Sequence, residues 1–114
     1  MENCLFCKIV SGAIPAARVL ETDSAIVIKD INPQAPVHLL AIPREHYAGI
    51  HEVPLTNKSF FDDLMRTVDE VVKKENLHSS GYRLVLNYGE KAGQSVDHIH
   101  VHILSGRTMH WPPG

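Results

Sequence analysis

The sequence predicts an α+β domain in which a five-stranded antiparallel sheet carries one long helix and a short N-terminal helix. Five short segments have the residue pattern of β-strands, and most of them are joined by short turns. One longer segment has apolar residues at three- and four-residue spacing, as on a helix. The chain of 114 residues has the length of one domain, residues 1–114, and contains no repeat or linker.

The first half of the chain is expected to supply the short helix and three strands. The helix covers residues 3–10, with Asn3 as its N-cap and Gly12 just beyond its end. The prolines within residues 32–36 keep that segment irregular. The three strands are expected at residues 18–21, 25–29 and 37–42.

The second half is expected to supply the long helix and the last two strands. The helix runs from Thr56 to about Asn76, and charged residues cover the side opposite its apolar stripe. Alternation returns at residues 82–88 and 97–104, which are predicted to be strands. The apolar stripe consists of Phe60, Phe61, Leu64, Met65, Val68, Val71 and Val72.

Composition excludes several classes of function. Eleven basic and thirteen acidic residues give a net charge of −2, so there is no basic excess with which to bind nucleic acid. No apolar run approaches the roughly 18 residues that span a bilayer, so no membrane association is expected. The first residues lack a basic segment followed by an apolar one, which predicts a cytoplasmic protein.

Residues 98–102, His-Ile-His-Val-His, are the most informative segment. Alternate side chains of a strand point the same way, so the three imidazoles share one face. The aliphatic side chains of Ile99, Val101 and Ile103 share the other face and are expected in the core.

The residues alone leave three interpretations of this strand open. The first is a partly exposed strand with a polar face. The second is a three-histidine zinc site with an open position, and the third is a nucleophilic imidazole flanked by phosphate-binding histidines. Successive imidazoles on a strand lie about 7 Å apart, which suits a phosphate-sized pocket. The nearby Asn87, Gly89, Gly93 and Ser95 are the parts of an anion cradle and favour the third interpretation.

Motifs along nearly the whole chain carry a family resemblance. They are residues 6–9 (FCKI), 14–16 (IPA), 30–36 (DINPQAP), 93–102 (GQSVDHIHVH) and 106–114 (GRTMHWPPG). With these motifs the sequence resembles the histidine triad (HIT) family, and within it the Hint branch of nucleoside phosphoramidases. The resemblance implies a HIT-like fold and a homodimer whose two sheets join into ten strands. Asp97 departs from it, because a tyrosine is familiar there in animal members.

The resemblance also implies an activity, namely hydrolysis of the P–N bond of adenosine 5′-phosphoramidates to release AMP. His100 would attack phosphorus and form a covalent nucleotidyl-histidine, without any cofactor for the chemistry. His102 would hydrogen-bond the phosphate oxygens, and His38 would support this arrangement. Ser95 would contact the phosphate and the departing amine.

A purine nucleotide site follows from the same resemblance. The two oxygens of Asp30 would accept hydrogen bonds from the ribose hydroxyls. An apolar wall around the purine does not distinguish adenosine from guanosine. Besides His100 and His102, the residues implied in nucleotide binding are Phe6, Ile9, Ile28, Asp30, Ile31, Asn87, Gly93 and Ser95.

Two cysteines near the N-terminus, Cys4 and Cys7, provide half of a zinc site. Zinc prefers four ligands, and several bacterial histidine triad proteins complete the set with two histidines, which correspond here to His46 and His98. The resemblance therefore implies a structural, tetrahedral zinc site, and His98 would have no catalytic role.

Two other functions remain open at this stage. One is hydrolysis of dinucleoside polyphosphates by the same nucleophile, against which the Trp-Pro-Pro-Gly ending argues. The other is a nucleotide-binding regulatory protein that acts through partner contacts.

Overall fold

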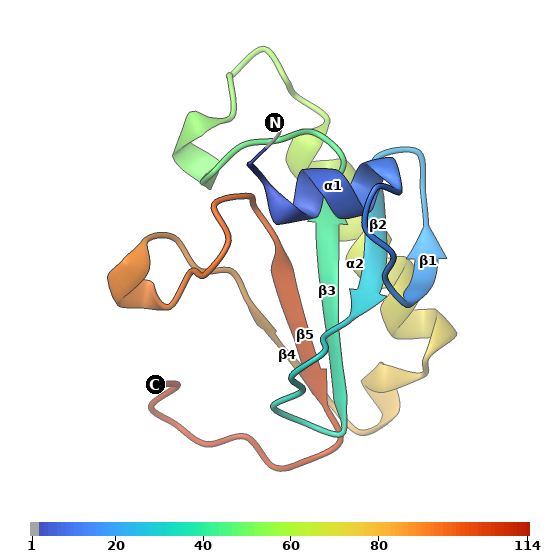
Figure 1. The fold of residues 1–114 in the computed structure, drawn as a ribbon. Coiled ribbons are helices and arrows are strands. Elements are labelled where there is room, and N and C mark those ends of the chain that lie inside the picture. The colour runs from blue at the N-terminus through green and yellow to red at the C-terminus, as the bar shows by residue number, and fades with distance from the viewer. Residues whose placement is uncertain (1–2) are drawn as a thin grey trace.

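A computed structural model describes residues 3–114 and has a five-stranded antiparallel sheet with one helix on each face (Figure 1). The strand order is β1-β2-β3-β5-β4, so β1 and β4 form the two edges. Among the described residues, neither helix is both long enough and apolar enough to cross a membrane. The elements are α1 (Leu5–Ser11), β1 (Arg18–Glu21), β2 (Ala25–Lys29), β3 (Val37–Pro43), α2 (Phe60–Lys74), β4 (Tyr82–Val85) and β5 (Val101–Ser105), with 3-10 turns η1 (Ile50–Glu52), η2 (Leu77–Ser79) and η3 (Glu90–Ala92).

Helix α2 is shorter than predicted and turns a narrower apolar face to the sheet. Phe61 and Met65, expected in the stripe, are 43% and 48% exposed, because they flank the line of residues that meets the strands. Thr67 is buried in their place, and its hydroxyl lies 3.1 Å from that of Thr22. The same hydroxyl donates to the carbonyl of Asp63, so a polar residue fits the core with its hydrogen bonds satisfied.

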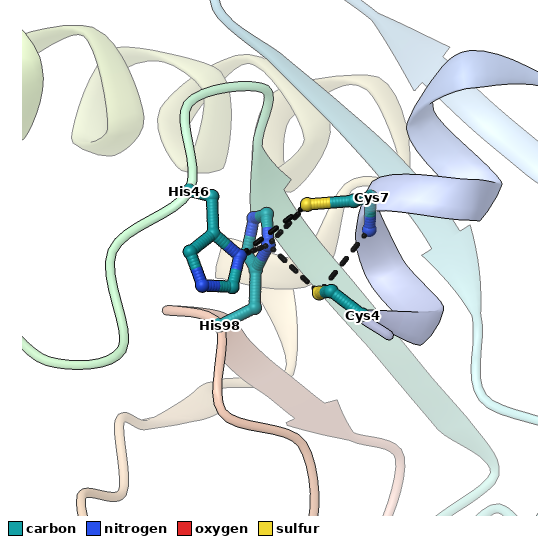
Figure 2. A group of neighbouring side chains, drawn as sticks. All are labelled: Cys4, Cys7, His46 and His98. Carbon is teal, nitrogen blue, oxygen red and sulfur yellow. Dashed lines mark hydrogen bonds between the residues drawn. The ribbon is translucent and has the colours of Figure 1, made fainter. Parts of the chain in front are cut away.

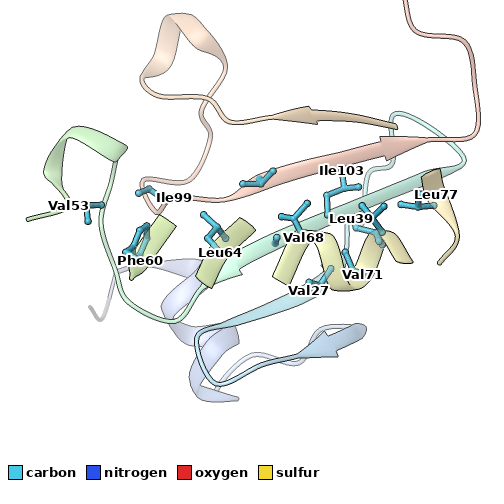
Figure 3. Close-up of a cluster of buried hydrophobic side chains, with 13 residues drawn as sticks. Val27, Leu39, Val53, Phe60, Leu64, Val68, Val71, Leu77, Ile99 and Ile103 are labelled. Atoms are coloured by element: carbon cyan, nitrogen blue, oxygen red, sulfur yellow. The ribbon is translucent and has the colours of Figure 1, made fainter. Parts of the chain in front are cut away.

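The main core lies between α2 and the sheet (Figure 3). Helix and strand residues contribute to it together, and β5 turns Val101 and Ile103 toward α2. Its buried members are Val27, Leu39, Ala41, Val53, Phe60, Leu64, Val68, Val71, Val72, Leu77, Ile99, Val101 and Ile103.

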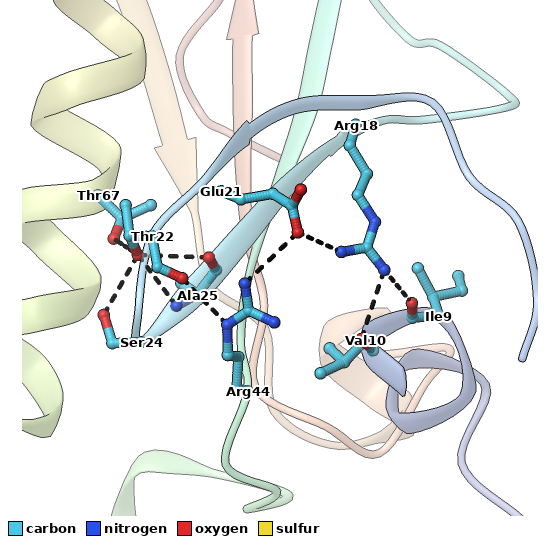
Figure 4. A network of polar contacts seen from close by, with 9 residues as sticks. All are labelled: Ile9, Val10, Arg18, Glu21, Thr22, Ser24, Ala25, Arg44 and Thr67. Atoms are coloured by element: carbon cyan, nitrogen blue, oxygen red, sulfur yellow. Dashed lines mark hydrogen bonds and ion pairs between the residues drawn. The ribbon is translucent and has the colours of Figure 1, made fainter. Parts of the chain in front are cut away.

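Helix α1 covers the opposite face of the sheet and begins at a different cap from the one predicted. Cys4, not Asn3, is the N-cap, and its sulfur accepts the backbone N–H of Cys7 at 3.4 Å. At the other end, the Arg18 guanidinium donates to the carbonyl of Ile9 at 2.6 Å and so ties α1 to the edge strand β1 (Figure 4). A side chain therefore binds the backbone at each end of α1, Cys4 at the N-terminus and Arg18 at the C-terminus.

The last two strands are shorter than the sequence pattern suggested. Strand β4 ends at Val85, and β5 begins only at Val101, where it pairs with β3 and β4. The backbone before β5 leaves the sheet and bonds another segment, since the N–H of Ile99 donates to the carbonyl of Tyr47 at 2.7 Å. The histidine segment is therefore half strand and half connection.

Candidate functional site

The alternation predicted for the histidine segment is correct although only part of it is strand. Ile99, Val101 and Ile103 are buried against α2. The imidazoles point to the α1 side, where the rings of His98 and His100 both meet the ring of Phe6. The site lies on this face.

His100 is held in one tautomer by the backbone. Its Nδ1 lies 2.8 Å from the carbonyl oxygen of His98, so Nδ1–H donates and Nε2 keeps its lone pair. Burial lowers the pKa of His100 and favours the neutral ring. A neutral imidazole with a free Nε2 is a nucleophile at neutral pH.

His38, His102 and Asp30 form a chain of polar contacts beside His100. The N–H of Gln34 donates to Nδ1 of His38 at 3.0 Å, so Nε2 of His38 carries the proton. This Nε2 lies 2.9 Å from Nδ1 of His102 and 3.3 Å from Oδ2 of Asp30. His102 therefore accepts at Nδ1 and offers Nε2–H as a donor.

The sheet register explains why these two rings meet. Leu40 of β3 pairs with His102 of β5, and His38 lies two residues away on the same face of β3. Burial, followed by the neighbouring His100 and His38, lowers the pKa of His102 to about 4. His102 is thus a neutral hydrogen-bond donor over the physiological pH range.

A cavity of about 400 Å³ opens beside these histidines and is mostly apolar. Phe6 and Ile9 of α1 form one wall, and Ile28 lies in the sheet beneath. Ile31 stands fully exposed at the rim. The cavity is lined by Leu5, Phe6, Ile9, Ile14, Pro15, Ala16, Ala17, Ile28, Lys29, Asp30, Ile31, Leu40, Ser95, Val96, His100 and His102.

Two of the residues predicted to bind the nucleotide lie outside this cavity lining. Asn87 and Gly93 are neighbours in the described part of the chain, since a Cβ on Gly93 would lie 3.9 Å from Nδ2 of Asn87. Gly93 has φ +92°, a conformation that favours glycine in the turn before Ser95. The structure therefore places Ser95 at the cavity, with Asn87 and Gly93 beside the loop that carries it.

The remaining histidine of the segment, His98, belongs to a different cluster of side chains. His98 lies with Cys4, Cys7 and His46, and their ligand atoms are all within 4.8 Å of one another (Figure 2). Nε2–H of His98 donates to the carbonyl of Pro43 at 2.8 Å, which leaves the Nδ1 lone pair facing the other three side chains. A single three-histidine metal site is thus wrong, because in the described residues the ligand atom of His98 groups with Cys4, Cys7 and His46, whereas that of His102 groups with Asp30 and His38.

The spacing of these four atoms fits a tetrahedral metal. Zn–N and Zn–S bonds of about 2.05 and 2.3 Å place two nitrogens about 3.3 Å apart, and a nitrogen and a sulfur about 3.5 Å apart. The Nδ1 atoms of His46 and His98 are 3.1 Å apart. The nitrogen–sulfur distances are 3.3 Å for His46 to Cys7, 3.4 Å for His98 to Cys4 and 3.6 Å for His98 to Cys7.

The comparisons with known proteins agree with this arrangement. The model of the HIT domain family matches residues 11–109. The chain belongs to the HIT family. Among solved structures, a HIT family hydrolase from Legionella pneumophila is 46% identical and superposes with a TM-score of 0.93, covering 98% of this chain and 100% of the other.

Two plant relatives of this HIT protein carry informative names. The "14 kDa zinc-binding protein" of Brassica juncea is 42% identical over 98% of this chain and 100% of its own length. The adenylylsulfatase HINT1 of Arabidopsis thaliana is 42% identical over 96% of this chain and 76% of its own length.

Sequence reasoning missed the buried Gln94 of this HIT domain. Its Oε1 accepts the N–H of Gly89 at 2.8 Å, and its Nε2 donates to the carbonyl of Ala48 at 2.9 Å. The side chain is 9% exposed and braces the loop before Ser95 against residues 44–49. A lone glutamine in a glycine-rich loop carries no sequence signal for such a contact.

Proposed function

We propose that this HIT protein is a purine nucleoside phosphoramidase, which hydrolyses the P–N bond of adenosine 5′-phosphoramidates and releases AMP. The observation that carries the proposal is the buried His100, whose Nδ1–H is fixed by the His98 carbonyl while Nε2 remains free. Such a ring is prepared for nucleophilic attack on phosphorus.

In the first step, Nε2 of His100 forms a bond to the α-phosphorus as the P–N bond breaks. The nitrogen takes up a proton from solvent water and leaves as the amine. The hydroxyl of Ser95, at the cavity, is its proposed hydrogen-bond partner. The result is a covalent nucleotidyl-histidine. Because Nδ1 stays hydrogen-bonded to the His98 carbonyl, the imidazolium charge that forms is stabilised.

In the second step, water attacks the same phosphorus, and His100 leaves with AMP as the product. Nε2–H of His102 donates to a phosphate oxygen in both steps, and His38 holds His102 in the tautomer that provides this donor. The groups that act on phosphorus are all side chains of this chain, so the proposal requires no catalytic cofactor.

The remaining cavity residues suit a nucleoside. Phe6, Ile9 and Ile28 form an apolar wall for a purine, with Ile31 at the rim. Asp30 lines the same cavity as His100 and His102, where its carboxylate can accept hydrogen bonds from the ribose hydroxyls. Asn87 and Gly93, which lie close to each other near Ser95, are the residues we propose for the phosphate end of the site.

We also propose that Cys4, Cys7, His46 and His98 bind a structural zinc ion. The four ligands supply two thiolates and two imidazole nitrogens and would leave no open position for water. Zinc there would join α1, the segment after β3 and the residues before β5.

A homodimer is the expected assembly. The outer edge of β4 is unpaired in the described chain, and Tyr82 at its start is 44% exposed. Pairing of two β4 edges would produce a ten-stranded sheet. Trp111 in the C-terminal segment is 82% exposed, which suits a tail that reaches toward the partner subunit.

The test is release of AMP from an adenosine 5′-phosphoramidate with a small alkylamine. We expect His100→Ala to reduce kcat by about 10³-fold or more, because the nucleophile is lost. The control is His78→Ala, which removes an exposed histidine beyond α2. Absence of AMP release by the folded wild-type protein would refute the proposal and favour a dinucleoside polyphosphate substrate or a nucleotide-binding role.

A second candidate rests on the name of the Arabidopsis relative. An adenylylsulfatase would use the same nucleophile on adenosine 5′-phosphosulfate, with sulfate as the leaving group. Sulfate departs without a proton, whereas an amine needs one. Replacement of Ser95 by alanine is therefore expected to slow phosphoramidate cleavage more than phosphosulfate cleavage, which distinguishes the two substrates.

A further inference from the structure

His98 belongs to both of the sites described above. Its Nδ1 faces the two sulfurs and His46, while its backbone carbonyl accepts Nδ1–H of His100 at 2.8 Å. One residue thus connects the Cys/His cluster to the atom that fixes the tautomer of the nucleophile. Any rotation of the His98 backbone changes that hydrogen bond.

Helix α1 provides a second connection. Phe6 lies between the two cysteines in sequence, and its ring meets His100 edge to face at a centroid distance of 4.9 Å. The same ring lines the cavity proposed for the purine. Arg18 holds the C-terminal end of α1, whereas its first turn contacts His46 and His98 through Cys4 and Cys7.

The end of β3 and the segment that follows it also bind the residues before β5. The carbonyl of Pro43 accepts Nε2–H of His98, and the carbonyl of Tyr47 accepts the N–H of Ile99. His46, between these two acceptors, is the remaining member of the cluster. The cluster therefore joins two pieces of chain, the start of α1 and the segment after β3, to the residues before β5.

We propose that Cys4, Cys7 and His46 are positioning residues for catalysis, which act through His98 and Phe6 so that metal and nucleotide binding are thermodynamically coupled. The inference rests on the proposed nucleotide site. A metal that fixes His98 fixes the acceptor for His100, and one that fixes the first turn of α1 fixes the purine wall. Whichever ligand binds first, metal or nucleotide, orders His98 and the first turn of α1. The second ligand then does not have to supply that ordering free energy, so each ligand binds more tightly when the other is bound.

Coupling of this kind is reciprocal and can be measured without turnover. Zinc affinity is determined by competition with a chromophoric chelator, with and without saturating AMP, and AMP affinity is determined calorimetrically on zinc-loaded and zinc-free protein. We expect both affinities to rise by the same factor, at least about fivefold. Lys8→Ala, an exposed non-ligand on α1, is expected to leave that factor unchanged.

A second readout examines the nucleophile itself. Long-range ¹⁵N–¹H spectra distinguish the Nδ1–H and Nε2–H tautomers of His100, with the signals assigned by their loss in His100→Gln. We expect one tautomer in zinc-loaded protein and a mixture after zinc removal or in Cys7→Ala. Cys7→Asp keeps a ligand oxygen for zinc and is expected to restore the single tautomer.

The outcomes separate this inference from the function on which it rests. If AMP binds but the zinc affinity is the same with and without AMP, the coupling is overturned and the proposed nucleotide site is unaffected. Coupling with an unchanged His100 tautomer overturns the positioning of His100 and assigns the effect to Phe6 alone. Failure of zinc-loaded protein to bind AMP overturns the proposed function as well.

Discussion

Gln94 is the buried side chain whose removal is expected to affect both stability and the loop that carries Ser95. Gln94→Met keeps the length of the side chain but removes the acceptor for the Gly89 N–H and the donor to the Ala48 carbonyl. A hydrogen bond contributes about 0.5–1.5 kcal/mol net to folding, so the loss of two is about 2 kcal/mol.

This free energy corresponds to a measurable change in melting temperature. An unfolding entropy of about 2.1 cal/mol/K per residue gives about 240 cal/mol/K for 114 residues, and about 2 kcal/mol then lowers Tm by about 8 °C. Differential scanning calorimetry of zinc-loaded protein measures it. Turnover is also expected to fall, because Ser95 follows Gln94 directly.

The matched control is the same substitution at the other glutamine of the chain. The side chain of Gln34 is exposed, and its one hydrogen bond, to the carbonyl of Asn32, is open to water. Gln34→Met is expected to change stability by less than about 0.5 kcal/mol. Equal Tm values for the two variants would show that the loop is not held by Gln94.

Further predictions concern the core, one turn and acid stability. Leu64→Ala, at a side chain 1% exposed, is expected to cost about 3 kcal/mol in urea unfolding, whereas Met65→Ala, at one 48% exposed, should cost less than about 0.5 kcal/mol; equal losses would refute the described helix face. Gly106→Ala, at φ +95° and with its Cβ 2.9 Å from that of Pro36, should lower stability by more than about 1 kcal/mol, and an unchanged urea midpoint would contradict this. The fold lowers the pKa of His102 from 6.5 to about 4. The stability that the neutral imidazole contributes is therefore complete above about pH 6.5 and is lost as the pH falls toward 4. His102→Gln should flatten that part of the curve of unfolding free energy against pH.

The sequence patterns that predicted the fold correctly are those that arise from burial of side chains in the core. The short apolar runs at residues 25–29 and 37–42 placed two central strands correctly, because most of these residues are buried, on both faces of the sheet. The ends failed where backbone hydrogen bonds leave the sheet, as at Ile99, whose N–H bonds to Tyr47. Such long-range partners have no local sequence pattern.

The candidate site was predictable to a similar depth. The spacing of the histidines put His100 and His102 on one face, and the family resemblance added Asp30 and joined the two cysteines with His46 and His98. The contact of His38 with His102 required the pairing register of β3 and β5, which the sequence does not contain. The N-cap role of Cys4 was missed because cysteine is rarely considered as a cap.

The direction of the histidines is determined by residues that do not take part in the chemistry. Burial of Ile99, Val101 and Ile103 against α2 stabilises this register by about 2 kcal/mol each, whereas each imidazole hydrogen bond contributes about 1 kcal/mol. A slip by one residue would turn the imidazoles into the apolar core beside α2 and the aliphatic side chains toward α1, so the core selects the face on which His98, His100 and His102 lie. Variants of these aliphatic residues should therefore disturb the nucleophile and the Cys/His cluster together.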